Sequence, residues 1–242
     1  GLDINTVDKL KGPGLARPKT ATFRLGDLVG MDTAVKVVQG VQYSCPKDAM
    51  VQDLKMPDAV AWMIEKGFFG NKSGQGFYKK TDERDKNGKR IIKSLDLNTN
   101  EYVEKASVNY SSLETSKNIE DPEKRIRALV EENDPGGELI RQSLAYLLSY
   151  AAQRIPEISG QVYSVDRALR AGFAWKFGPF EYWDILGFAK GKALIEKYGL
   201  EIPEWTRVFE QSGQKSFYQY KGSKRQCWNP LSASMEDMPG PD

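Results

Sequence analysis

The sequence predicts a mainly α-helical protein, made of two tandem copies of one helical unit with a small antiparallel β-meander between them. Three observations support this prediction. A set of residues recurs in the same order between 140 and 158 positions later in the chain. Apolar residues in both copies, and in one long segment between them, are spaced at the period of an α-helix. One stretch between the copies alternates strand-like runs with turn sequences.

The recurring residues define the two copies. The string FRLGDLVG, residues 23–30, returns without a gap as FEYWDILG, residues 180–187. The string MPDAVAWMIEKG, residues 56–67, returns as IPEWTRVFEQSG, residues 202–213, with a proline and an acid near its start and a glycine at its end. Because these strings keep their order, we interpret the pattern as an internal duplication. The paired residues are Asp8 and Asp166, Phe23 and Phe180, Asp27 and Asp184, Gly30 and Gly187, and Phe77-Tyr78 and Phe217-Tyr218.

Within a copy, residues typical of helix ends predict the order of the elements. A short helix carries Asp8 early, and Gly30 marks a tight chain reversal or a close helix–helix approach after a second short helix. A later helix follows Pro57, which fits a first helical turn, and Gly67 ends it in the left-handed cap position. A short strand at Phe77-Tyr78 closes the unit. Since one copy buries its apolar faces poorly, two stacked copies are expected to form the core.

The region between the copies predicts three further elements. Residues 77–105 contain the hairpin signal Asn87-Gly88 and a second turn at 98–100, which together predict a meander of three strands. Residues 106–121 are polar and predict a linker. Residues 121–133 predict an amphipathic helix, which the following DPGG string terminates.

One predicted helix occurs only once. Residues 138–155 carry a broad apolar stripe with few charges, which predicts a central, mostly buried helix. It precedes the second copy, so its counterpart for the first copy would lie upstream of Gly1. We therefore expect a piece of a longer protein, in which the first copy lacks its long helix. Val37, Val38 and their apolar neighbours would then lack cover, and the chain would self-associate through them.

Composition argues against several classes of function. The formal net charge of +2 over 242 residues provides no strong field for nucleic acid or an anionic membrane. No apolar run approaches the roughly 20 residues of a membrane-spanning helix. The two cysteines, without CxxC spacing, predict a reducing, cytoplasmic location. Histidine is absent, which removes the commonest general base and zinc ligand, so we predict no catalytic residue and no metal site.

Three strings carry a family resemblance. RPKTATFRLGDLVGMDT (17–33), GFFGNKSGQGFYKK (67–80) and GFAWKFGPFEYWDILG (172–187) together resemble the C-terminal region of 3-hydroxyacyl-CoA dehydrogenases. The third string is close to the hallmark of that family. The nearest resemblance is to multifunctional bacterial fatty-acid β-oxidation proteins that carry a duplicated C-terminal dehydrogenase domain. The resemblance implies a fold like the C-terminal domain of these enzymes, which is similar to that of 6-phosphogluconate dehydrogenase.

The resemblance implies a parent enzyme that oxidises the 3-hydroxyl group of an acyl-CoA and passes hydride to NAD. An N-terminal Rossmann domain would bind NAD and supply a base made of a histidine and a glutamate. Neither histidine nor GxGxxG occurs in this sequence, so the chain alone is predicted to bind no NAD and to be inactive. A substrate-positioning asparagine of the family would lie upstream of Gly1 and, in the second copy, fall on Arg141, which implies a degenerate second copy. The implied partners are the acyl-CoA, the Rossmann domain, a C-terminal crotonase-like (enoyl-CoA hydratase) domain and a second copy of the chain.

The candidate substrate-binding residues are Arg17, Pro18, Lys19 and Thr20, where a basic side chain could meet a phosphate of the acyl-CoA. The alternative is a solvated loop that only positions the helix at Phe23. Asp27 and Asp184 are either polar site residues or structural residues, and their repetition favours the structural role. The aromatic residues at 175–183 would pack between the copies or hold an acyl chain, and we favour packing.

The sequence predicts a function and a division of the chain into four parts. As function, we expect part of an NAD-dependent 3-hydroxyacyl-CoA dehydrogenase of fatty-acid β-oxidation, which contributes substrate-cleft and interdomain or dimer surfaces. The alternative is a helical repeat module used only for protein–protein interaction or scaffolding. The parts are a first dehydrogenase C-terminal unit (1–80), the meander and linker (81–120), a second such unit (121–220) and a linker toward a following domain (221–242).

Overall fold

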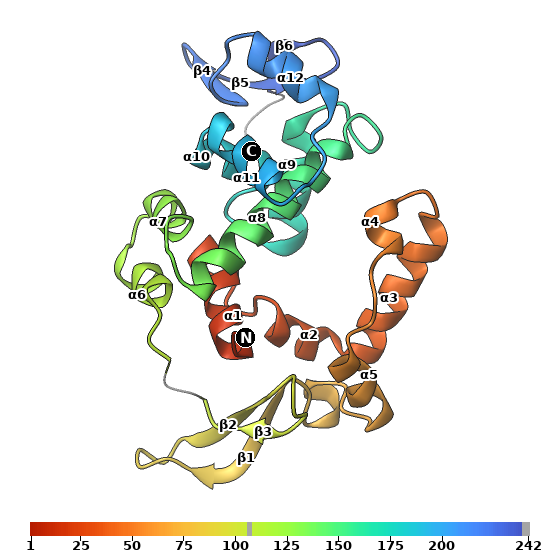
Figure 1. The fold of residues 1–242 in the computed structure, drawn as a ribbon, viewed down its shortest axis with the longest axis vertical. Coiled ribbons are helices and arrows are strands. Elements are labelled where there is room, and N and C mark those ends of the chain that lie inside the picture. The colour runs from red at the N-terminus through yellow and green to blue at the C-terminus, as the bar shows by residue number, and fades with distance from the viewer. Residues whose placement is uncertain (106–107, 239–242) are drawn as a thin grey trace. The chain divides into compact units, whose positions relative to one another are not determined.

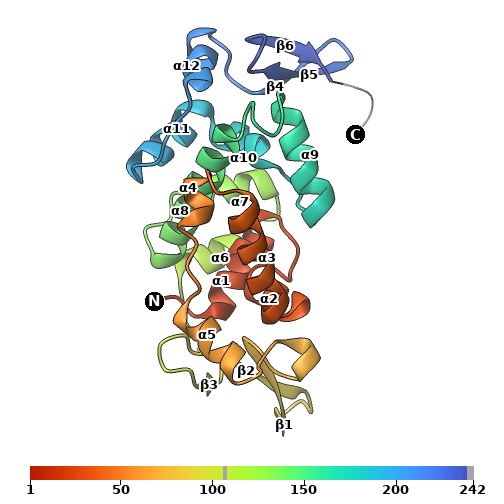
Figure 2. The same cartoon turned by 90° about the vertical axis from the view of Figure 1, so that its right-hand side faces the viewer.

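The computed structural model describes residues 1–105 and 108–238, which divide into two compact units. Both units are mainly helical, and each contains a three-stranded antiparallel sheet. Figures 1 and 2 show the elements of the two units in two views. The predicted mainly α-helical fold class is confirmed. Unit 1 is formed by Gly1–Gly12 and Lys19–Asn109, and unit 2 by Pro13–Pro18 and Tyr110–Asp242.

Unit 1 consists of helices followed by a β-meander. Along the chain its elements are α1 (Ile4–Lys11), α2 (Phe23–Val29), α3 (Met31–Ser44), α4 (Ala49–Gln52), α5 (Asp58–Glu65), the 3-10 helix η2 (Asn71–Ser73), β1 (Tyr78–Arg84), β2 (Arg90–Leu95) and β3 (Tyr102–Val103). The strands pair in the order β1-β2-β3, and Tyr78 lies opposite Ser94. The core of the unit includes Ile4, Met31 and Phe77, which come from α1, α3 and the residue before β1.

Glycines turn the chain of unit 1 at the places that the sequence predicts. Gly30 has a φ of +96° and alone separates α2 from α3, so one residue ends one helix and precedes the next. Gly67, with a φ of +71°, lies just beyond α5 in the left-handed conformation. Pro57 directly precedes the first residue of α5, where its missing N–H costs no helical hydrogen bond.

Unit 2 is built around one long helix. Along the chain its elements are the 3-10 helix η1 (Pro13–Leu15), α6 (Ser111–Asn118), α7 (Pro122–Leu129), α8 (Pro135–Gln153), α9 (Val162–Phe173), α10 (Pro179–Leu186), α11 (Phe188–Lys197), α12 (Glu204–Gln211), β4 (Tyr218–Lys221), β5 (Lys224–Asn229) and β6 (Ser234–Asp237). The predicted central helix is α8, which packs on α10 and α11 and buries Leu144 and Leu148 completely. The sheet has the order β4-β5-β6, and Tyr218 lies opposite Cys227.

The DPGG string begins a helix instead of ending one. Asp134 is the N-cap of α8 and accepts the backbone N–H of Gly137 at 2.8 Å, while Pro135 occupies the first turn. The preceding helix, α7, already ends at Leu129. The prediction that this string terminates a helix at 121–133 is therefore wrong, because an aspartate followed by proline is also a start signal.

Both predicted linkers contain regular structure. The linker predicted at 221–242 is wrong for its described part, where β5 and β6 form two strands of a sheet and Cys227 and Trp228 are buried. These strands are short and carry charged residues at adjacent positions, which lie on opposite faces, so their apolar–polar alternation is weak. In the linker predicted at 106–121, residues 111–118 form α6, and residues 106–107 lie outside the described residues.

The β-meander is part of the repeating unit and not an insertion between two copies. Leu95 donates its backbone N–H to the Phe77 carbonyl at 2.8 Å, and Trp228 donates to the Phe217 carbonyl at the same distance of 2.8 Å. Each unit therefore ends in its own sheet, and the boundaries predicted at residues 80, 120 and 220 differ from those observed. The segment Pro13–Pro18 was predicted to lie in the first unit, but it belongs to unit 2.

Candidate functional site

Two buried aspartates of unit 1 connect α1, α2 and β1. Asp27 of α2 accepts the backbone N–H groups of Phe77 at 2.7 Å and Tyr78 at 2.9 Å. Asp8 of α1 accepts the backbone N–H of Phe23 at 2.7 Å and the hydroxyl of Tyr78 at 2.8 Å. The rings of Phe23 and Phe77 meet edge to face, with centroids 4.8 Å apart. Both carboxyls are therefore engaged by the fold.

Unit 2 repeats each of these contacts. Asp184 of α10 accepts the backbone N–H groups of Phe217 at 2.8 Å and Tyr218 at 3.0 Å. Asp166 of α9 accepts the backbone N–H of Phe180 at 2.9 Å and the hydroxyl of Tyr218 at 2.7 Å. The rings of Phe180 and Phe217 also meet edge to face, at 5.3 Å. The paired landmarks of the sequence thus have the same neighbours in both units, and the aspartates hold backbone in both.

Burial raises the pKa of three of these aspartates. It raises the pKa of Asp27 above its ordinary value, that of Asp184 to about 7 and that of Asp166 to about 8. The backbone N–H groups that bond each carboxyl lower the pKa, but the effect of burial is larger. In unit 2, the folded state therefore retains protons that the unfolded chain releases.

The stability of unit 2 is expected to fall as the pH rises from about 4 to about 8. Over this interval the folded state binds more protons at Asp166 and Asp184 than the unfolded state, in which an aspartate has a pKa near 3.8. Four of the five tryptophans lie in unit 2, so the denaturant midpoint followed by tryptophan fluorescence reports on it. The Asp184→Asn variant should show a smaller decrease. A midpoint that rises with pH over this interval would contradict the prediction.

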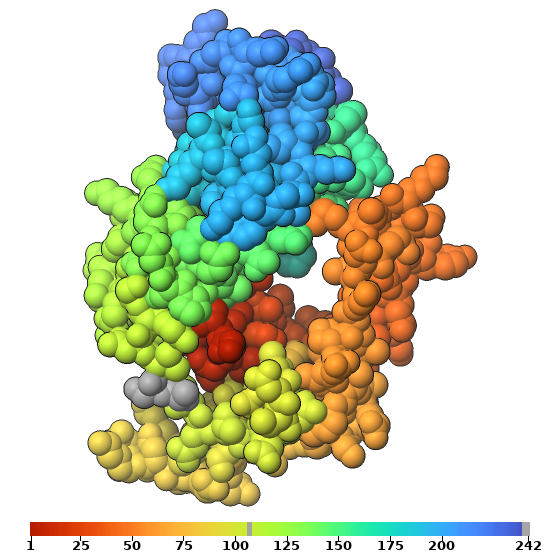
Figure 3. Space-filling view, viewed as in Figure 1, coloured from red at the N-terminus to blue at the C-terminus, as the bar shows by residue number. Residues whose placement is uncertain are grey.

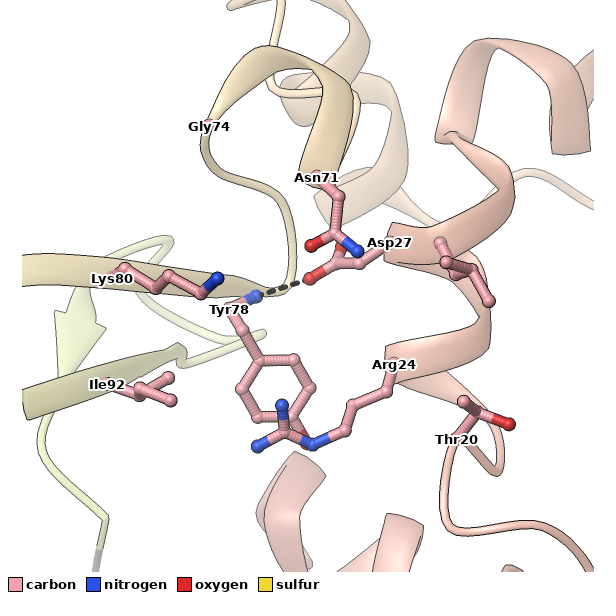
Figure 4. Close-up of a pocket in the computed structure, with 9 residues that line it drawn as sticks. Thr20, Arg24, Asp27, Asn71, Gly74, Tyr78, Lys80 and Ile92 are labelled. Atoms are coloured by element: carbon pink, nitrogen blue, oxygen red, sulfur yellow. Dashed lines mark hydrogen bonds between the residues drawn. The ribbon is translucent and has the colours of Figure 1, made fainter. Parts of the chain in front are cut away.

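An open pocket of about 510 Å³ lies in unit 1 between α2, η2 and the strands β1 and β2. Figure 4 shows Arg24 reaching it from α2 and Lys80 from β1, with the side chain of Asn71 next to the carboxyl of Asp27. The carbon at the centre of the Arg24 guanidinium lies 4.0 Å from the centroid of the Tyr78 ring, within cation–π range. The remaining lining residues are Thr20, Leu28, Gly74 and Ile92.

Unit 2 has a smaller pocket at the equivalent place, of about 270 Å³. It contains Glu181 at the position of Arg24 in the repeat. It contains Arg225 at the position of Ile92, because both residues lie two places before the partner of the repeat tyrosine in the sheet. Arg225 and Glu181 form an ion pair at 3.1 Å. The pocket of unit 2 therefore satisfies its own charges.

The four predicted substrate-binding residues do not line one cavity. Arg17-Pro18 belongs to unit 2, and Lys19-Thr20 belongs to unit 1. The Arg17 guanidinium lies 3.6 Å from the centroid of the Trp175 ring, and its Nε donates to the Tyr182 hydroxyl at 3.2 Å. Of the four residues, Thr20 lines the pocket of unit 1. A substrate contact of these residues stays a prediction.

The aromatic stretch at 175–183 packs inside unit 2. Phe180, Tyr182 and Trp183 are fully buried, and the Tyr182 hydroxyl donates to the carbonyl oxygen of Leu15 at 2.5 Å. Together with the Arg17 contacts, this bond holds the segment Pro13–Pro18, which comes from the first copy in the sequence, within unit 2. These contacts favour packing over an acyl-chain site, but the packing lies within unit 2, and packing between the two units stays a prediction.

The sequence contained a signal for the pocket of unit 1 that our sequence analysis did not use. FRLGDLVG and FEYWDILG match at their phenylalanine, aspartate and glycine but reverse charge at Arg24 and Glu181. Such a reversal at a matched position marks a place where the two copies differ in chemistry. Lys80 and Asn71 carry no comparable signal, because only the fold brings them to Arg24.

Among the described residues, no three histidine, cysteine, aspartate or glutamate side chains are grouped to hold a metal, and no helix has the length and apolar character to cross a bilayer. The Gly74-Gln75-Gly76 turn precedes a strand and not a helix, so it does not fit the phosphates of NAD. Arg141 donates to the carbonyl oxygens of Val130 at 3.0 Å and Glu132 at 2.7 Å, which indicates a structural role.

Comparisons with known proteins agree with the family resemblance found in the sequence. Residues 1–80 match the family model described as the C-terminal domain of 3-hydroxyacyl-CoA dehydrogenase. The chain is 34% identical over 218 residues to a probable 3-hydroxyacyl-CoA dehydrogenase of Bacillus subtilis, a match that covers 90% of the chain and 27% of that protein. It is 27% identical over 228 residues to a putative fatty acid oxidation complex trifunctional enzyme of Rickettsia felis, which covers 91% of the chain and 29% of that protein.

The matches cover different shares of the chain. A probable 3-hydroxyacyl-CoA dehydrogenase of Deinococcus radiodurans is 40% identical over 83 residues, covering 34% of the chain and 23% of that protein. The chain thus spans between a fifth and a third of the length of these relatives. Residues 1–80 are therefore a C-terminal domain of the 3-hydroxyacyl-CoA dehydrogenase family, and the chain is related to members of that family over about nine tenths of its length.

Proposed function

We propose that this chain is part of a cytoplasmic NAD-dependent 3-hydroxyacyl-CoA dehydrogenase of fatty-acid β-oxidation. The observation that carries the proposal is the match of residues 1–80 to the C-terminal domain of that family. The chain supplies surfaces and not the base, because it contains no histidine and no GxGxxG turn. NAD and the histidine–glutamate base belong to a Rossmann partner domain. A crotonase-like domain is a further partner, which the word trifunctional in the name of the Rickettsia relative supports.

The test is an assay of the complete protein that contains these 242 residues, with a 3-hydroxyacyl-CoA and NAD as substrates. The complete protein should form NADH, and the 242-residue chain alone should form none. A complete protein that does not oxidise any 3-hydroxyacyl-CoA would overturn the proposal. Saturable binding of NAD to the 242-residue chain would overturn the assignment of NAD to another domain.

The surface offered to another domain or to a second chain is the apolar face of α3. In unit 2, α8 covers α11, where Leu194 is 7% exposed and Ile195 is fully buried. The equivalent residues of α3, Val37 and Val38, are 57% and 38% exposed. This face borders an apolar groove of about 290 Å³ between α3 and the start of α5. Figure 3 shows the atoms of α3 and α4, in orange, at the surface.

The Val38→Asp variant is expected to reduce association of the 242-residue chain through this face. A charge at the centre of an apolar contact is desolvated without a partner, which opposes burial. Sedimentation velocity at several concentrations would measure the effect. The matched control is Val208→Asp on α12, because Val208 is also 38% exposed but lies in unit 2. If the wild-type chain is monomeric at every concentration, self-association is excluded and the face is left for another domain.

A second candidate function is an interaction module without a role in catalysis. The exposed apolar face of α3 and the structural engagement of the aspartates favour it. The two candidate functions predict different activities for the complete protein. An interaction module predicts that the complete protein associates through this face but oxidises no 3-hydroxyacyl-CoA.

A further inference from the structure

We propose that unit 2 acts as a clamp on the chain of unit 1, because it holds the segment Pro13–Ala16 in the connection between α1 and α2. The start of α2 keeps its native order only while unit 2 holds this segment. The clamp does not depend on dehydrogenase activity, so it can be tested separately from the proposed function.

Arg125 of α7 binds the first half of the segment. Its guanidinium donates from Nη2 to the carbonyl oxygen of Pro13 at 3.0 Å and from Nε to that of Gly14 at 3.2 Å. Its Nη1 donates to the carbonyl oxygen of Ile119, between α6 and α7, at 2.8 Å. A guanidinium carries five N–H donors in one rigid plane, so a single side chain can serve all three carbonyl groups. Arg125 is therefore fixed within unit 2 while it holds the segment.

Two further donors of unit 2 bind the second half of the segment. The Tyr182 hydroxyl donates to the carbonyl oxygen of Leu15 at 2.5 Å, and the backbone N–H of Lys176 donates to that of Ala16 at 3.1 Å. Leu15 and Tyr182 are fully buried, so the leucine side chain anchors the segment. Four consecutive carbonyl oxygens thus each accept a hydrogen bond from a donor outside the segment. Release of the segment would leave buried donors of unit 2 without acceptors, which is unfavourable.

The repeat shows that unit 1 departs from the common fold at the place where its chain enters the clamp. In unit 2, α9 continues to Phe173, whereas α1 ends before the string Gly12-Pro13-Gly14. Proline interrupts the hydrogen bonds of a helix, and glycine lowers helix propensity, so this string prevents α1 from continuing. Leu15 matches Phe173 at the offset of 158 residues that relates the buried aspartates of α1 and α9. Leu15 is 0% exposed and Phe173 is 56% exposed, so this position is buried only where unit 2 takes the chain.

Asp8 holds the far end of the connection within unit 1. Its carboxyl accepts the backbone N–H groups of Thr22, Phe23 and Arg24, at 3.0, 2.7 and 3.0 Å. Each residue that is ordered in the connection loses conformational entropy, and the contacts of the clamp offset this loss. Once the segment is released, the bonds to Asp8 alone have to order the connection. These bonds should then open more often.

The experiment is hydrogen exchange of the 242-residue chain and of two clamp variants, Arg125→Gln and Tyr182→Phe. Both residues are positioning residues, since they act on α2 through the segment. In each variant the amides of Thr22, Phe23 and Arg24 should exchange at least about tenfold faster than in wild type, because the loss of one buried hydrogen bond changes an equilibrium by about this factor. Native tryptophan fluorescence identifies the variants that fold, and Tyr182→Phe, which removes only a hydroxyl, supplies the test if Arg125→Gln does not.

The matched controls remove similar side-chain bonds of unit 2 that do not reach the segment. Arg127→Gln removes a bond from α7 to the carbonyl oxygen of Ile185, and Tyr163→Phe removes a hydroxyl that accepts a bond within α9. Whatever their effect on the denaturant midpoint of unit 2, both controls should leave the three amides of unit 1 at the wild-type exchange rate. Wild-type exchange in the clamp variants would overturn the proposal. An equal increase in the controls would also overturn it, because the cause would then be a general loss of stability.

Discussion

An Asp166→Ala chain is expected to lose roughly 3–5 kcal/mol of the stability of unit 2. Asp166 is 1% exposed and accepts the backbone N–H groups of Phe180 and Glu181 and the hydroxyl of Tyr218. Alanine leaves these three donors without their acceptor, and at each buried donor the loss costs about 1–3 kcal/mol. Denaturant unfolding followed by tryptophan fluorescence would measure the loss, because most tryptophans lie in unit 2.

Two further variants separate this loss from a general effect of removing a carboxylate. Asp166→Asn keeps one acceptor oxygen and should be destabilised less than Asp166→Ala. Asp237→Ala removes an exposed carboxylate of the same unit that pairs with Lys224 and accepts the side-chain amide of Gln226, and it should cost much less than Asp166→Ala. Equal losses in Asp166→Ala and Asp237→Ala would show that the buried aspartate does not hold the unit together.

A Gly76→Ala chain is expected to lose roughly 2–4 kcal/mol of the stability of unit 1. A Cβ atom on Gly76 would overlap the carboxylate oxygen Oδ1 of Asp27 and would lie 2.5 Å from the Cα of Gly70. Neither neighbour can move freely, because Asp27 is bonded to the backbone of β1 and Gly70 belongs to the backbone itself. Hydrogen exchange of the amides of β1 and β2 would report the loss within unit 1.

The control for this variant is Gly40→Ala, on α3 of the same unit. Apart from its chain neighbours and the backbone of its own helix, no described atom lies within 4 Å of the Cβ that alanine would add there, and Gly40 lies inside α3. Alanine should therefore be neutral or stabilise the helix by about 0.5–1 kcal/mol. Wild-type exchange rates in Gly76→Ala would contradict the close packing of the loop on Asp27.

The sequence was sufficient for the elements that local residues specify. Gly30 and Gly67 predicted breaks that their positive φ angles require, and the apolar stripe at 138–155 predicted α8. These signals act over a few residues, through backbone conformation and helical period, so the sequence shows them directly. The repeat in the sequence also predicted which residues have equivalent contacts in the two units. Asp8 with Asp166 and Asp27 with Asp184 stood at matched places, and the structure gives each pair the same donors.

Contacts between residues distant in the sequence fix which segments belong to the same unit. Pro13–Pro18 belongs to unit 2, although the residues on both sides of it in the sequence belong to unit 1, because the Tyr182 hydroxyl and the Trp175 ring hold it. The weakly alternating strands at 218–237 form a sheet only because they pair with one another and bury Cys227 and Trp228. Such contacts depend on the free energy of packing residues distant in the chain, which a local pattern does not contain.

The pocket of unit 1 also combines features visible in the sequence with features that depend on tertiary contacts. The family resemblance, the repeat and the lack of histidine were already visible in the sequence, because motif strings and composition are properties of the chain alone. It did not determine that Arg24 and Lys80 converge, because one lies on a helix and the other on a strand. The hydrogen bonds of Asp27 to the backbone at β1, with the edge-to-face contact of Phe23 and Phe77, hold that helix and strand together. A site made by such convergence is decided by tertiary packing, since its charges meet only after the core has formed.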